Sequence, residues 1–197
     1  MKKNILIIGG SSGIGLELIK LIGGENNVFS ACRTNEHLTG LNVTHIPFDV
    51  LTDTLDLSLL PESLDGFVYC PGSINLRPFK GLKPETFLND FSINVMGAVK
   101  TLQTVLSKLQ SGDVTASVVF YSTVAVQTGM AYHASVAAAK GALEGLARSL
   151  AAELAPKVRV NVIAPSITDT PLADKFLNND TKKENGKKGK VRTRKTE

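Results

Sequence analysis

The sequence contains no tryptophan, only two cysteines and no long apolar run. Two cysteines, Cys32 and Cys70, are too few for a disulfide framework, which predicts a reduced, cytoplasmic protein. The apolar run after Lys2 and Lys3 stops at Gly9, too early for a signal peptide. No stretch approaches the ~20 apolar residues of a membrane span, so we expect no membrane partner.

Basic residues are scarce in the body of the chain. The whole chain has a net charge of +4, yet residues 178–197 hold six Lys and two Arg against three carboxylates, a net charge of +5. The other residues therefore carry a net charge of −1. A nucleic-acid-binding domain spreads basic residues over one face of its fold, so we expect no nucleic-acid partner. We expect one domain over residues 1–177 and a disordered basic tail over residues 178–197.

Apolar runs rich in Val and Ile alternate with helical patterns. We expect strands at 4–8, 27–31, 43–48, 66–70, 114–121 and 158–163. We expect helices at 13–22, 84–109 and 133–154, with a weak helical segment near 55–63. Strands that are apolar almost throughout are typical of a sheet covered on both faces. The fold class predicted is α/β, a Rossmann-like doubly wound parallel sheet of about six strands.

A glycine-rich turn joins the first predicted strand to the first predicted helix. Gly9, Gly13 and Gly15 have the spacing G-x-x-x-G-x-G, and Ser11 and Ser12 add hydroxyl donors. Residues without side chains let the backbone approach a pyrophosphate, which the N–H groups of a helix N-terminus bind. A tight turn without a ligand is the alternative. The position between strand and helix favours a dinucleotide site.

The residues after the second and third strands indicate which dinucleotide binds. No acid that could bond a ribose 2′-hydroxyl ends the second strand, where Arg33 stands in SACRTNEHL. An arginine there suits a 2′-phosphate and favours NADP over NAD, although a plain surface arginine is the alternative. Asp49 and Val50, in PFDV, end the third strand at the sheet edge where ligands bind.

Together these stretches resemble the short-chain dehydrogenase/reductase family, over residues 3–172. GGSSGIG resembles its cofactor turn, FDV its adenine contact, and NVIAPSITDTPL the segment that closes over the nicotinamide. INVMGAV carries an asparagine at the catalytic Asn position, and VVFYSTVAV resembles the strand that ends in the catalytic serine. The cofactor contacts implied by the resemblance are Gly9, Ser11, Ser12, Gly13, Ile14, Gly15, Arg33, Asp49, Val50, Gly72, Lys140, Pro165, Ile167 and Thr170.

The resemblance also implies a tyrosine one helical turn before a lysine, whose charge lowers the pKa of the tyrosine. Lys140 matches the lysine, but Val136 occupies the tyrosine position and has no proton to exchange. Thr123, thirteen residues before Val136, has the register of the serine, and Ser122 is its neighbour. The implied catalytic set is Asn94, Ser122, Thr123 and Lys140.

Another group could supply the proton that Val136 lacks. His133, three residues earlier, is one candidate and water is another. A residue that merely begins the helix is the alternative for His133.

The resemblance implies a homodimer formed through the two long helices. After the segment NVIAPSITDTPL, family members continue with a last sheet strand. That strand is missing here, so the chain looks C-terminally truncated or replaced. The implied function is an NAD(P)(H)-dependent oxidoreductase, with NADP as the cofactor and a small carbonyl or alcohol as the substrate, impaired by Val136. The alternatives are an NADP-binding sensor or interaction module and a damaged gene product. No residue identifies one substrate.

Overall fold

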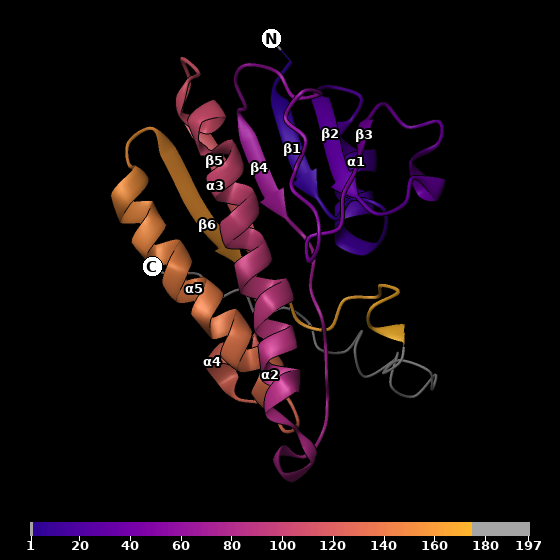
Figure 1. Ribbon diagram of the computed structural model, residues 1–197, viewed down its shortest axis with the longest axis vertical. Coiled ribbons are helices and arrows are strands. Elements are labelled where there is room, and N and C mark those ends of the chain that lie inside the picture. Colours follow the sequence, from indigo (N-terminus) through magenta and orange to yellow (C-terminus); the bar gives the residue numbers. More distant parts are fainter. Residues whose placement is uncertain (1, 175–197) are drawn as a thin grey trace, which may run out of the picture.

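Six parallel strands form a single sheet in the order β3-β2-β1-β4-β5-β6 (Figure 1). The structure is a computed structural model that describes residues 2–174, so the predicted tail and the boundary at residue 177 lie outside it. The strands are β1 (Asn4–Ile8), β2 (Asn27–Cys32), β3 (Thr44–Pro47), β4 (Gly66–Tyr69), β5 (Ala116–Tyr121) and β6 (Val158–Ile163). All six predicted strands and the Rossmann-like fold are confirmed. The strand order reverses between β1 and β4, the point at which such sheets bind ligands.

Helices cover both faces of the sheet. On one face lie α1 (Gly13–Ile22) and the short 3-10 helix η1 (Glu36–Leu38), and a core forms between Ile19 and strand residues Ile7 and Val68. On the other face lie α2 (Pro84–Phe91), α3 (Gly97–Gln110) and α5 (Ala134–Leu154), which run in front of the sheet in Figure 1. Alternate strand residues point to opposite faces, so each strand contributes to both cores.

The helix predicted at 84–109 contains a turn of different hydrogen bonding. A π-helical turn, η3 (Ser92–Met96), separates α2 from α3. The Tyr69 hydroxyl donates a hydrogen bond of 2.5 Å to the carbonyl oxygen of Ile93, and a Cβ on Gly97 would overlap that hydroxyl. Such turns break the regular pattern of a helix and often mark functional sites. Residues 84–110 are nevertheless helical throughout, so the predicted helix is confirmed and only its α-helical hydrogen bonding differs at this turn.

Two further predictions differ in detail. Residues 55–63 form turns rather than a helix, and the buried Leu55 and Leu60 hold this segment against the core below α3. The helix predicted at 133–154 begins one residue later, at Ala134. Two short helices, η2 (Phe79–Gly81) and α4 (Ala125–Thr128), lie in connections. None of the helices described within residues 2–174 combines the length and hydropathy that a membrane span requires.

Candidate cofactor and active site

Most of the predicted site residues follow the carboxyl ends of strands. Because the strands are parallel, these ends meet at one edge of the sheet. The residues that this arrangement brings to that edge are Gly9, Arg33, Asp49, Gly72, Ser122, Thr123 and Pro165. Asn94 and Lys140 come instead from η3 and α5, on the face covered by the long helices.

The glycine turn has the backbone shape that the glycines predict. Gly9 and Gly13 have φ angles of 79° and 55°, a region that residues with a Cβ rarely adopt. A Cβ on Gly15 would overlap the carbonyl oxygen of Gly9, so the turn is too tight for any other residue there. The Ser12 side chain makes no capping hydrogen bond among the described residues, which leaves N–H groups at the start of α1 for a ligand. The turn fits a pyrophosphate.

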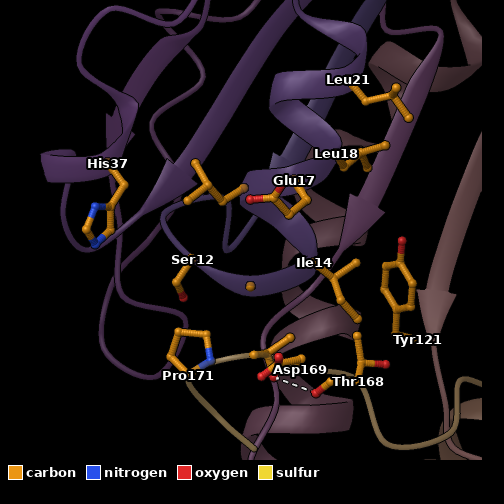
Figure 2. A pocket seen from close by; sticks show the side chains of 13 residues that line it. Ser12, Ile14, Glu17, Leu18, Leu21, His37, Tyr121, Thr168, Asp169 and Pro171 are labelled. Carbon is orange, nitrogen blue, oxygen red and sulfur yellow. Dashed lines mark hydrogen bonds between the residues drawn. The ribbon is translucent and has the colours of Figure 1, made fainter. Parts of the chain in front are cut away.

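A pocket of about 590 Å³ opens beside this turn (Figure 2). Ile14 and the Tyr121 ring stand on one side of it, and Thr168 and Pro171, from the segment after β6, lie below. A Cβ on Gly13 would lie only 3.4 Å from the Thr170 side chain, so this segment closes over the turn. The pocket is therefore walled by the turn and by the segment expected to cover the nicotinamide.

The rest of the closing segment lies outside this pocket. Ile167 is 54% exposed and is not among the residues that line the pocket. The carbonyl oxygen of Pro165 accepts a hydrogen bond of 3.2 Å from the N–H of Val124, which ties the start of the segment to the end of β5. Contact of Pro165 and Ile167 with a cofactor stays a prediction.

The adenine end of the predicted site is open to solvent. Arg33 directly follows β2 and is exposed, while Asp49 and Val50 are half-buried after β3. The Asp49 carboxylate accepts a hydrogen bond of 2.9 Å from the N–H of Leu51, which holds this turn in shape. An exposed guanidinium at the end of β2 is available to a phosphate group. His37, which sequence reasoning missed, lines the pocket above Ser12 (Figure 2).

Asn94 and Lys140 converge on Gly72. A Cβ on Gly72 would lie 3.2 Å from Asn94 Oδ1 and 3.7 Å from Lys140 Nζ, so both polar groups face the loop after β4. Asn94 is fully buried, and its Oδ1 has no hydrogen-bond partner among the described residues. A buried polar atom without a partner costs about 1–3 kcal/mol, and the group is satisfied when a ligand or water donates to it.

Lys140 is a buried lysine rather than a solvated one. Its side chain is 8% exposed, and Nζ donates a hydrogen bond of 2.7 Å to the carbonyl oxygen of Tyr121. Burial lowers the pKa of Lys140 to about 8. Burial also raises the pKa of the Cys70 thiol to about 12, so the thiol is neutral at physiological pH.

The two candidate hydroxyls at the end of β5 have different partners. Ser122 Oγ donates a hydrogen bond of 2.5 Å to the carboxylate of Glu144, on α5. Thr123 Oγ1 accepts a hydrogen bond of 3.3 Å from the N–H of Ala125, so its own hydrogen can go to another group. The structure therefore ties Ser122 to α5 and leaves the Thr123 hydroxyl as the better candidate for contact with a substrate.

No acid–base group replaces tyrosine at position 136. Val136 is 4% exposed and lies one turn before Lys140, on the buried face of α5. His133 precedes the first turn of α5, where its Nδ1 lies 2.8 Å from the carbonyl oxygen of Ala131. Tyr132 is 58% exposed and has a positive φ of 69°. Neither His133 nor Tyr132 therefore occupies the place of Val136, whereas Lys140 Nζ faces the same loop as Asn94.

Comparison with known proteins identifies a family model and relatives that match most of this chain. A family model described as short chain dehydrogenase matches residues 3–181. A tropinone reductase homolog from Arabidopsis thaliana is 28% identical over 199 residues, covering 92% of this chain and 74% of that protein. L-xylulose reductase from Bos taurus is 28% identical over 180 residues, covering 86% of this chain and 73% of that protein.

Solved structures with the same fold include cofactor complexes. A short chain dehydrogenase from Shigella flexneri, in complex with NADP, has a TM-score of 0.83 and 26% identity, covering 92% of this chain and 84% of its own. One from Escherichia coli CFT073, in complex with NADPH, has a TM-score of 0.83 and 25% identity at the same coverage. Because the family model spans most of the sequence and the fold agrees, this chain belongs to the short-chain dehydrogenase/reductase family.

Proposed function

We propose that this chain is an NADP(H)-dependent oxidoreductase that acts on a small carbonyl or alcohol. The observation that carries this proposal is the convergence of Asn94 Oδ1 and Lys140 Nζ on Gly72, at the sheet edge that holds the glycine turn. Membership of the family and the NADP and NADPH complexes of similar structures support the cofactor class. When bound, the nicotinamide donates or accepts the hydride.

The chain's own residues would hold the two ends of this cofactor. The backbone of the glycine turn and the hydroxyls of Ser11 and Ser12 would bind the pyrophosphate. Arg33 would bind the 2′-phosphate, which is the basis for our preference for NADP over NAD. Asp49 and Val50 would contact the adenine end. The nicotinamide end would be contacted by Gly72, Lys140, Pro165, Ile167 and Thr170.

Proton transfer has to proceed without a tyrosine. We infer that the Lys140 ammonium donates the proton directly to the substrate oxygen, since a pKa near 8 lies close to physiological pH. Thr123 would donate a hydrogen bond to the same oxygen. Val136 contributes only packing there, so turnover is slower than with a tyrosine at that position.

A second function follows from the same valine. A chain that keeps the glycine turn but has no phenol at position 136 could bind NADP as a sensor or interaction module without catalysing turnover. Val136 favours this alternative, whereas the buried Lys140 favours catalysis.

Thermal unfolding and turnover together test these proposals. NADPH should raise the unfolding midpoint in a saturable way and more than NADH does, because a ligand of the folded state stabilises it. NADPH oxidation is then followed with aldehydes, ketones and keto sugars, for the wild type and for Lys140→Met. Turnover that disappears in Lys140→Met supports the oxidoreductase. Binding without turnover supports the alternative, and a cooperatively unfolding chain that responds to neither cofactor refutes both.

We also propose a cytoplasmic homodimer assembled through α3 and α5. Small side chains recur along α5 at Ala138, Ala142 and Gly145, where a second helix could approach closely. Sedimentation of the purified chain over a range of concentrations tests the dimer, and a monomer at every concentration would refute it.

A further inference from the structure

A carboxyl group is buried next to the candidate site. Asp90, near the end of α2, has no exposed surface. Its Oδ1 accepts hydrogen bonds from Ser73 Oγ and, at 2.8 Å, from Asn75 Nδ2, both in the loop after β4. Its Oδ2 accepts a hydrogen bond from Ser135 Oγ, on α5. Three donors thus compensate the charge, and the carboxylate joins three separate segments of the chain.

The Asn94 amide is linked to this carboxylate through its nitrogen, Nδ2, and not through its oxygen, Oδ1. Its Nδ2 donates to the carbonyl oxygen of Asp90 at 2.8 Å and to Ser73 Oγ at 3.1 Å, which uses both N–H groups of the amide. Oδ1 is therefore left on the opposite side, where it faces Gly72. Ser135 has no such link to Asn94, because its hydroxyl bonds the other oxygen of the carboxylate.

The acceptor oxygens of Asp90 set the direction of these hydrogen bonds. A carboxylate only accepts, so Ser73 must give its single hydroxyl hydrogen to Asp90. Ser73 Oγ can then only accept from Asn94, and Asn94 must present Nδ2 toward it. Together with the carbonyl oxygen of Asp90, which also accepts from Nδ2, this acceptor turns the amide carbonyl toward Gly72 and the Lys140 side. With a neutral donor at position 90, Ser73 Oγ could donate instead, and only the carbonyl oxygen of residue 90 would then hold Nδ2 inward.

We propose that Asp90 is a positioning residue, which acts through Ser73 to present Asn94 Oδ1 to the nicotinamide end of the site. This proposal rests on the proposed function, because it takes Gly72 to contact that end of the cofactor. The group that Oδ1 accepts from is a ligand hydroxyl or a bound water. Asp90 itself touches neither.

The orientation of Asn94 is tested first in the free protein, which needs no ligand. Asn94→Asp identifies the side-chain NH₂ resonances of Asn94 in ¹H–¹⁵N spectra. In the wild type these protons exchange slowly, since both are hydrogen-bonded in a buried site. Asp90→Asn and Ser73→Ala should speed their exchange and shift the resonances. The matched control Ser135→Ala removes a hydroxyl from the same carboxylate and should leave them in place.

The link to the nicotinamide is tested with two ligands. Adenosine 2′,5′-bisphosphate reports on the phosphate and adenine end, whereas NADPH also places the nicotinamide, whose fluorescence reports on its surroundings. Asp90→Asn and Ser73→Ala should weaken NADPH about tenfold and lower the emission of the bound nicotinamide. The affinity of these two variants for the bisphosphate should stay at the wild-type level. Ser135→Ala should change the affinity for neither ligand.

Each outcome bears on a separate claim. Unchanged Asn94 resonances in Asp90→Asn overturn the proposal, as does an equal effect of Ser73→Ala and Ser135→Ala. Bound NADPH with wild-type emission in Asp90→Asn also overturns it. An equal loss of affinity for NADPH and for the bisphosphate in Asp90→Asn shows a general structural role instead. A wild type that binds neither ligand refutes the proposed function, and the amide spectrum then still decides whether Asp90 orients Asn94.

Discussion

Lys140 Nζ donates a hydrogen bond of 2.7 Å to the carbonyl oxygen of Tyr121, the last residue of β5. This bond joins the middle of α5 to the edge of the sheet where the site residues meet. No carboxylate forms an ion pair with Lys140 within residues 2–174. Burial without an anionic partner lowers the pKa of the ammonium and keeps its proton available.

The buried lysine predicts a pH dependence of stability. The folded-state pKa of about 8 lies below the ordinary value of 10.5, so between these pH values the unfolded chain binds more protons than the folded one. The free energy of unfolding of the wild type, relative to Lys140→Met, should therefore rise by about 3 kcal/mol from pH 8 to pH 10.5. Urea unfolding of both variants at a series of pH values measures this difference. A difference that stays flat across the window would show that Lys140 is solvated.

Val136→Tyr should raise turnover of NADPH with a carbonyl substrate. A phenol one turn before Lys140 would supply a proton donor, and general acid catalysis contributes about 100-fold or more. Val136→Phe is the matched control, because it adds a ring of nearly the same size without a hydroxyl. Steady-state kcat measures the effect. Equal rates for the two variants would mean that the substrate oxygen does not lie beside position 136.

Ser122→Ala and Thr123→Val should separate stability from turnover. Ser122 bonds the partly buried Glu144, so its loss should lower the free energy of unfolding by about 2 kcal/mol and leave kcat unchanged. Thr123→Val keeps the shape of the side chain but removes the hydroxyl, and should lower kcat about 100-fold with little effect on stability. The reverse pattern would assign the substrate contact to Ser122.

Arg33→Ala should change the preference between the two cofactors. Without the guanidinium that would bind the 2′-phosphate, the affinity for NADPH should fall about tenfold or more, and the affinity for NADH should stay unchanged. Arg159→Ala, on β6 at the far side of the sheet, removes the same charge from another exposed position and should affect neither. Titration calorimetry measures both affinities. Equal weakening of NADPH by the two variants would indicate only long-range attraction.

Local patterns in the sequence determined the framework of this protein. Short apolar strands, the glycines at positive φ and the spacing of Val136 from Lys140 all act over a few neighbouring residues, so they are visible without a structure. The sheet and the glycine turn agree with these patterns. The π-helical turn within the long helix at 84–109 was not visible in them, because the Tyr69 hydroxyl meets the helix at Ile93 from a distant strand.

Contacts between distant segments determined the site itself. Asp90 shows nothing in the sequence beyond its place one turn before Asn94, yet it is compensated by Ser73 and by Ser135, 45 residues away. The separation of Ser122 from Thr123 likewise depends on Glu144, 22 residues further along the chain. Burial and hydrogen-bond partners exist only once the helices pack on the sheet. Local propensity could therefore indicate where a cofactor binds, whereas tertiary packing decided which side chains are oriented to act there.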